Sequence, residues 1–176
     1  GYVGNVTGTL TLDDANDNVI FQFVDQATAR LSVNGIVYDF DRASLVEISI
    51  LDFGGGNDTI QLGSEVNLQT TLDGGDGDDL IIGGGGHDGL SGGGGNDTLI
   101  GGAGNDFIYA WDSGPCTVGG DAWTVCGPPA VDSSRDSIDG GDGDDEIYAN
   151  AGLDTVVGSA GADQITFDTN TDCLYV

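Results

Sequence analysis

The sequence predicts an all-β fold, a parallel β-roll preceded by a β-rich N-terminal segment. Three observations predict it: a repeat of nine residues, a short strand-like stretch in every repeat, and alternating apolar residues over residues 1–52. The expected organisation is an N-terminal segment or cap at 1–52 and the roll at 53–166, with an insertion at 110–130. A C-terminal strand or tail at 167–176 completes the chain.

The repeat keeps one phase through four uninterrupted blocks. Each block has glycine at positions 1, 2 and 4, aspartate at position 6 and an aliphatic residue at position 8. These blocks are 74–82 (GGDGDDLII), 83–91 (GGGGHDGLS), 92–100 (GGGGNDTLI) and 101–109 (GGAGNDFIY). Further copies are 53–61, 140–148, 149–157 and 158–166, with weaker ones at 65–73 and 131–139. A flexible glycine-rich linker has no reason to hold this phase, so we reject that interpretation.

Each block divides into a turn and a short strand. The glycines permit positive φ and leave backbone carbonyls uncovered, while positions 7 to 9 alternate as a strand does, with position 8 inward. Two blocks make one coil, and position 8 lines a thin core. Its predicted members are Ile60, Leu72, Ile81, Leu90, Leu99, Ile108, Ile138, Ile147, Val156 and Ile165.

The charge is extreme, with 30 acidic and 3 basic residues and a formal net charge of −27. Such a chain is either disordered through self-repulsion or folded around cations, and 38% hydrophobic content favours the second. Stacked turns would place carboxylates about 4.8 Å apart, which is repulsive without a cation. Calcium suits aspartate and carbonyl oxygens, whereas zinc or copper prefers imidazole or thiolate. Nucleic acid and membrane insertion are not expected partners.

The blocks resemble the RTX (repeats-in-toxin) nonapeptide GGxGxDxUx over about 53–166. The resemblance implies a right-handed parallel β-roll, or β-solenoid, in which each Ca²⁺ lies between turns two blocks apart. Position-6 aspartates and turn carbonyls would hold each ion. The implied metal ligands on one side are Asp58, Asp79, Asp97, Asp136 and Asp154, and on the other side Asp88, Asp106, Asp145 and Asp163.

In this scheme Thr70 is a defective rung of the second side. Successive pairs give about seven Ca²⁺ ions, which would reduce the formal charge from −27 to about −13. The turns of Asp136, Asp154 and Asp163 lack some or all of the glycines, so the most complete sites are those of Asp79, Asp97, Asp88 and Asp106.

Outside the repeats, residues 1–52 predict strands at 10–12, 19–23, 31–33, 36–40 and 46–50. The insertion at 110–130 should be a loop closed by a Cys116–Cys126 disulfide. It carries Trp111 and Trp123, which either pack locally or form a partner surface. Cys173 is either a buried thiol or an intermolecular partner. This cysteine usage fits an oxidising, extracellular location.

No catalytic constellation is predicted. His87 is the sole histidine and is interpreted as a solvent-facing turn residue. Three functions stay open. The first is a calcium-binding extracellular structural protein, such as a matrix, surface-layer, adhesin or filament subunit, with head-to-tail self-association. The second is a non-catalytic C-terminal module of a larger secreted enzyme. The third is a calcium-dependent binding module acting through the tryptophan loop. The chain lacks methionine, so we interpret it as a processed product or a fragment.

Overall fold

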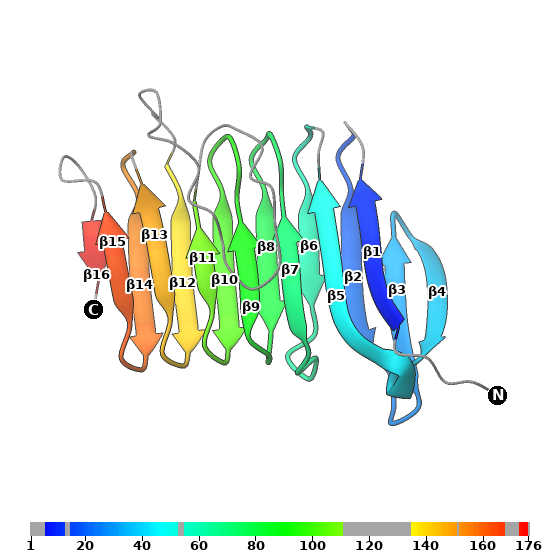
Figure 1. Ribbon diagram of the computed structural model, residues 1–176. Coiled ribbons are helices and arrows are strands. Elements are labelled where there is room, and N and C mark those ends of the chain that lie inside the picture. Colours follow the sequence, from blue (N-terminus) through cyan, green and yellow to red (C-terminus); the bar gives the residue numbers. More distant parts are fainter. Residues whose placement is uncertain are drawn as a thin grey trace.

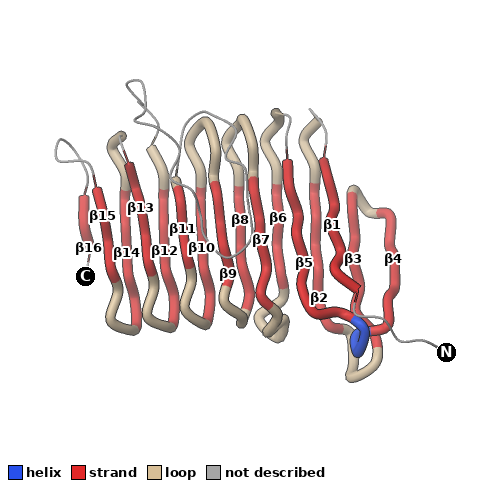
Figure 2. The backbone as a smooth tube through the Cα atoms, viewed as in Figure 1, coloured by secondary structure: helices blue, strands red, loops and turns tan. Residues whose placement is uncertain are grey.

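The computed structural model describes residues 6–12, 15–52, 55–110, 135–150, 152–167 and 173–175. Over these residues the chain winds back and forth between two facing sheets, and the only helix is the short 3₁₀ turn η1 (Arg42–Ser44) (Figures 1 and 2). The prediction of an all-β fold built on parallel sheets is therefore confirmed.

The first sheet has seven strands among the described residues, each parallel to the next. In spatial order they are β1 (Val6–Leu12), β5 (Leu45–Asp52), β7 (Gln69–Asp73), β9 (Asp88–Ser91), β11 (Phe107–Tyr109), β13 (Glu146–Asn150) and β15 (Gln164–Phe167).

The second sheet has nine described strands. Their order is β16 (Cys173–Tyr175), β14 (Thr155–Ala160), β12 (Ser137–Asp142), β10 (Thr98–Ala103), β8 (Leu80–Gly84), β6 (Thr59–Leu62), β2 (Asn18–Phe23), β3 (Thr28–Val33) and β4 (Ile36–Asp41). The strands from β16 to β2 are parallel, whereas β3 is antiparallel to both of its neighbours.

The register follows the nonapeptide phase. In the second sheet Ile60 pairs with Ile81, and Ile81 pairs with Leu99, which is two blocks further along the chain. Leu99 then pairs with Ile138, 39 residues away instead of 18, so the 21 extra residues match the predicted insertion at 110–130. The roll therefore resumes in phase after the insertion. Ala110 at its start is buried and donates its N–H to the Tyr148 carbonyl oxygen, whereas 111–130, with Trp111, Trp123, Cys116 and Cys126, lie outside the described residues.

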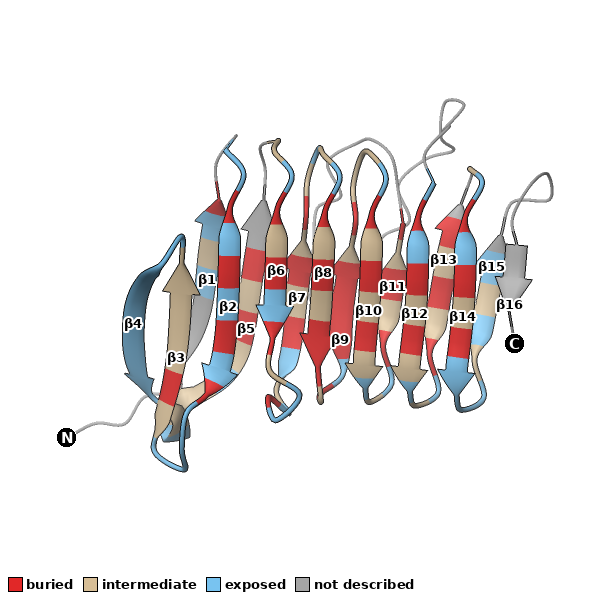
Figure 3. Ribbon diagram, turned by 180° about the vertical axis from the view of Figure 1, so that it is seen from behind, coloured by how far each residue is buried: buried red, intermediate tan, exposed pale blue. Residues whose placement is uncertain are grey.

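The core is a narrow stripe between the sheets, visible as bands of buried residues along the strands (Figure 3). All but one of the predicted position-8 residues are buried, and Ile165, on the terminal strand β15, is partly buried. At the N-terminal end the core widens to include Phe21 and Phe23, whose rings meet edge to face at 6.0 Å. Burial of one aliphatic side chain per repeat is the hydrophobic contribution that the nine-residue pattern allows.

The five strands predicted within residues 1–52 are present as β1 to β5. β1 and β2 form the first coil of the roll, since they pair in parallel with β5 and β6. The hairpin β3–β4 then extends only the second sheet. At the other end, β16 pairs in register with β14, so Leu174 stands opposite Val156 at position 8 and the repeat reaches Tyr175.

Candidate metal centre

The position-6 aspartates lie directly before a strand or, for Asp88, at the first residue of one, and their carboxylates are turned into the roll. The side chains of Asp79, Asp88, Asp97 and Asp106 are no more than 3% exposed. Asp58, Asp136, Asp145 and Asp154 are also buried, while Asp163 is half-buried. Buried carboxylates are costly unless they are hydrogen-bonded, paired with a positive charge or bound to a cation, so their partners decide what the turns do.

On one side of the roll these aspartates form a continuous hydrogen-bonded row, the first ladder. The backbone N–H of each aspartate donates to Oδ1 of the aspartate one coil further on. The N···O distances are 2.8 Å for Asp58 to Asp79, 2.9 Å for Asp79 to Asp97, 2.8 Å for Asp97 to Asp136 and 3.0 Å for Asp136 to Asp154.

On the opposite side lies the second ladder, built in the same way. The N–H groups of Asp88 and Asp106 each donate at 2.8 Å to the next aspartate, and that of Asp145 donates to Asp163 at 3.1 Å. The row begins at Thr70, whose hydroxyl donates to Asp88 Oδ1 at 2.7 Å. The structure thus arranges the predicted aspartates in the two rows that the phase implies, with Thr70 as the rung without a carboxylate.

The second carboxylate oxygen is what makes the ladders candidate metal sites. Oδ2 of Asp58, Asp88, Asp106 and Asp145 is buried and accepts no hydrogen bond from any residue that the structure describes. A buried acceptor without a partner costs about 1–3 kcal/mol, and more when it is charged. One such atom is an irregularity, but the same atom left over in turn after turn indicates a ligand.

The position-1 glycines show where that ligand would lie. A Cβ built on Gly140 would stand 2.5 Å from Asp145 Oδ2 and 2.9 Å from the carbonyl oxygen of Gly158. On Gly83 it would stand 2.7 Å from Asp88 Oδ2 and would also overlap the carbonyl oxygen of Gly101. A carboxylate oxygen and the carbonyl oxygen of the next turn therefore approach the same point, and only glycine leaves that point open.

Without a cation, three buried carboxylates of the second ladder resist ionisation. Burial raises the pKa of Asp88 to about 6 and that of Asp106 to about 7, and it also raises the pKa of Asp145. The neighbouring charges of Asp88 and Asp145 add to the effect at Asp106. A cation bound at Oδ2 would reverse this, because opposite charge favours the ionised form.

The donor set fits calcium. Among the described residues no three His, Cys, Asp or Glu side chains cluster as a metal-ligand group, because each rung supplies only one carboxylate. The remaining ligands would have to be backbone carbonyls, such as those of Gly101 and Gly158. An all-oxygen set of carboxylates and carbonyls suits Ca²⁺, whereas zinc and copper prefer nitrogen or sulfur.

Two features of the site are not visible in the nonapeptide phase. The first is Asp17, whose N–H donates to Asp58 Oδ1 at 2.5 Å, so that it forms an extra rung of the first ladder. The second is Asn34, in the β3–β4 turn, whose amide donates to Asp17 Oδ1 at 2.5 Å and ends the row. Residues 16–19 (NDNV) place Asp17 two residues before an inward valine, which is the signal that would have found it.

Position 5 also has a role that the sequence interpretation missed. Its side chain accepts a hydrogen bond from the position-5 N–H of the next coil: Asn57 from Asp78 at 3.1 Å, and Asp78 from Asn96 at 2.9 Å. His87 follows the same rule, since its Nδ1 lies 2.9 Å from the N–H of Asn105. The prediction that His87 is an exposed turn residue is confirmed, and its ring in addition joins two turns. The repeated Asn or Asp at position 5 is the signal for this outer row.

Comparison with known proteins agrees with this geometry. The family model described as the RTX calcium-binding nonapeptide repeat (4 copies) matches residues 70–99, 91–113 and 132–165. A search of curated proteins and a search of solved structures each gave no significant match. The matched residues contain most of both ladders, and repeats of this family bind Ca²⁺. Over residues 70–165, the chain therefore belongs to the RTX calcium-binding nonapeptide repeat family.

Proposed function

We propose that this chain is an extracellular structural protein whose roll folds and becomes rigid when Ca²⁺ binds in its turns. The observation that carries the proposal is the unpartnered Oδ2 of Asp58, Asp88, Asp106 and Asp145 among the described residues, together with the turn carbonyls that approach the same points. The nine position-6 aspartates of the two ladders are the proposed ligands, for about seven ions.

Repulsion within the ladders makes folding depend on the metal. Neighbouring rungs are about 4.8 Å apart, and several carboxylates in line oppose stacking of the coils. Ca²⁺ bound between two rungs neutralises both and joins one turn to the next. Because the ligands come from different coils, metal binding and coil stacking are one event. Low calcium would leave the chain extended, and the millimolar calcium outside cells would fold it.

An extracellular location follows from this mechanism and from the usual secretion of RTX proteins. Among the described residues, no helix is long and apolar enough to span a membrane. The right-handed sense of the roll, a capping role for residues 1–52 and head-to-tail self-association stay predictions. So do the alternatives of a non-catalytic module in a larger secreted enzyme and of a binding module using Trp111 and Trp123. A longer precursor with a catalytic segment would favour the first of these alternatives.

Far-UV circular dichroism during a calcium titration tests the proposal, with electron microscopy of the same samples. We expect a transition from coil to β structure with Ca²⁺, and none with an equal concentration of Mg²⁺, which demands octahedral geometry. A spectrum already rich in β structure and unchanged in chelator would refute calcium-dependent folding. Filaments that appear with the transition would support a structural role.

A further inference from the structure

The N-terminal end of the roll is unequal in its two sheets. Strands β1 and β2 face one another as the first coil, and beyond them the second sheet continues through β3 and β4 (Figures 1 and 3). Among the described residues, no strand of the seven-stranded sheet lies beyond β1 to cover these two strands. The second sheet therefore overhangs the first by a width of two strands.

The inner face of the overhang is apolar. In the pairing register Val33 stands opposite Ile36, Leu31 opposite Tyr38 and Ala29 opposite Phe40. The same register links these residues to Val19, Phe21 and Phe23, which point into the core. Directly opposite residues share a face of the sheet, so the three β4 side chains continue the core face. Nevertheless Ile36 is 60% exposed, Tyr38 49% and Phe40 41%.

The edge of the overhang is also open. β4 is the last strand of its sheet and β1 is the last strand of the other, so neither has a hydrogen-bonded neighbour on its outer side among the described residues. Long apolar edge strands are normally covered or blocked by charge, because they template pairing with another chain. β4 has two carboxylates, Asp39 and Asp41, but its other four residues, Ile36, Val37, Tyr38 and Phe40, are exposed apolar side chains.

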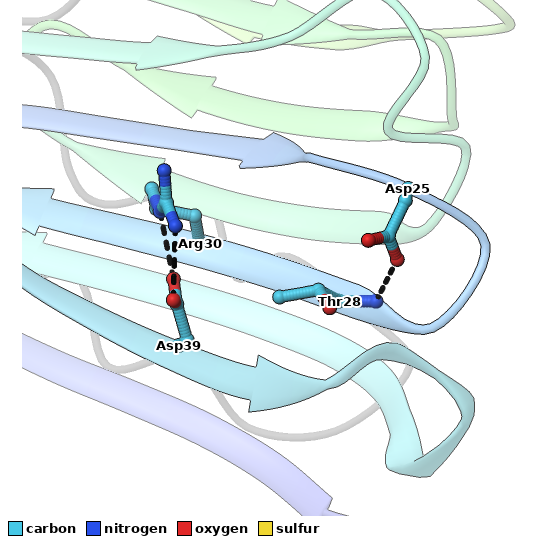
Figure 4. A network of polar contacts seen from close by, with 4 residues as sticks. All are labelled: Asp25, Thr28, Arg30 and Asp39. Carbon is cyan, nitrogen blue, oxygen red and sulfur yellow. Dashed lines mark hydrogen bonds and ion pairs between the residues drawn. The ribbon is translucent and has the colours of Figure 1, made fainter.

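Charge favours a second copy of this chain as the occupant. Residues 18–46 hold three carboxylates and two of the three basic residues, a net charge of −1, whereas the rest of the chain has −26. Arg30 also forms a bidentate ion pair with Asp39, with N···O distances of 2.7 and 2.9 Å, and the Asp25 carboxylate accepts a hydrogen bond from the N–H of Thr28 (Figure 4). This hairpin is therefore a nearly neutral surface at which two such acidic molecules can approach closely.

The shape of the overhang fits the same occupant. A two-fold axis parallel to the strands brings the N-terminal ends of two copies together. The second sheet of one copy then lies in line with the first sheet of the other. Each β3–β4 overhang therefore occupies the space, two strands wide, that lies beyond β1 of the other copy. β3 then faces β4 of the second copy, and the free edge of β4 meets the free edge of β1. Because β4 and β1 run in opposite directions, the new pairs are antiparallel (Figure 1). We infer that two copies of this chain associate in this way, as a closed dimer joined through the overlapping β3–β4 hairpins.

This inference goes beyond the proposed function, since it concerns the end of the roll and not its turns. An interface with two-fold symmetry is closed, so association stops at two chains, whereas head-to-tail stacking would continue without limit. Three half-exposed large side chains on each copy bury on the order of 300 Å² per copy, or about 600 Å² in total, which is below the ~1,200 Å² total of a stable interface. The dimer should therefore be weak and its population should depend on protein concentration.

Sedimentation equilibrium of the full chain in saturating Ca²⁺ tests the proposed dimer interface. We expect a monomer–dimer equilibrium, with the dissociation constant raised at least about tenfold by Tyr38→Glu or by the milder Phe40→Ser. Val37→Glu is the matched control, because Val37 is 52% exposed on the same strand but faces outward, and it should change the constant less than about threefold. Circular dichroism of each variant in Ca²⁺ verifies that the roll is folded.

Hydrogen exchange reports on the backbone amides at the free edge of β4. In the wild-type chain, the β4 amides that face away from β3 should gain protection as the concentration rises through the dissociation constant, and in Tyr38→Glu they should not. A wild-type monomer at every concentration, species that grow beyond two chains, or equal disruption by Val37→Glu would each overturn the inference. None of these outcomes bears on the calcium transition, so the two proposals fail separately.

Discussion

Replacement of Asp106 by asparagine should change stability in opposite directions with and without calcium. Asn keeps the acceptor Oδ1 that Asp88 N–H uses at 2.8 Å, but replaces the unpartnered Oδ2 with an uncharged amide. In chelator this removes a carboxylate whose pKa burial raises from 3.8 to about 7. A shift of that size corresponds to about 4 kcal/mol, and solvent screening in a turn reduces it to on the order of 2 kcal/mol.

With calcium the effect should reverse. Asp106 lies between Asp88 and Asp145 in the second ladder, so it is a proposed ligand of two neighbouring ions. Loss of one charged ligand from each should raise the midpoint of the calcium transition about tenfold or more, since calcium affinity depends on the number of charged ligands.

The assay is circular dichroism of wild type, Asp106→Asn and Asp142→Asn, first in chelator at pH 7 and then across a calcium titration. Asp142 is an exposed carboxylate at position 3 of a neighbouring turn, so its replacement removes the same charge without touching a ladder. We expect a larger folded fraction in chelator and a higher calcium midpoint for Asp106→Asn alone. Equal midpoints for the two variants, or a smaller folded fraction of Asp106→Asn in chelator, would refute the reasoning.

Three further predictions concern the turns and the end of the first ladder. In chelator the roll should gain stability as the pH falls from about 7 towards 4, because the raised pKa values of Asp88 and Asp106 make the folded state bind more protons than the unfolded state. Circular dichroism as a function of pH measures this. A decrease in the folded fraction over that range would contradict the prediction. Gly83→Ala should lower the thermal midpoint in Ca²⁺, because the new Cβ would fill the point that the two oxygens approach. Gly55→Ala should lower the midpoint less, because its Cβ would meet its nearest atom at 3.3 Å. Equal decreases would show that the point beside Gly83 is not a ligand position. Asn34→Gly should lower the free energy of unfolding in urea by about 1 kcal/mol, because the hydrogen bond to Asp17 at the end of the first ladder is lost. Asn34→Ala should lower it by about 1–2 kcal/mol more, because Asn34 has a φ of 51°, which alanine adopts at a cost. Equal losses for the two variants would show that the left-handed conformation has no role.

The sequence by itself determined the coil, because everything a coil needs recurs within nine residues. Position 6 supplies a buried or half-buried carboxylate in every block but that of Thr70, position 8 supplies the buried aliphatic residue, and position 1 must be glycine where an oxygen-lined point is to stay open. Once the strands stack in phase, the partners of Asp79 or Asp106 follow from counting 18 residues, or 39 across the insertion. The two rows of aspartates could therefore be predicted without a structure.

Only the tertiary structure decided what happens where the period stops. Asp17 joins the first ladder across 41 residues, and it can do so because the β3–β4 hairpin projects sideways instead of separating β2 from β6. The same detour brings Asn34 onto the end of the ladder and leaves the apolar inner face of β4 beyond the cover of β1. A repeat specifies contacts between neighbours of the same kind, whereas the boundary of the array depends on which unlike segment packs against it. That choice is made by packing across the sheets, which no local phase encodes.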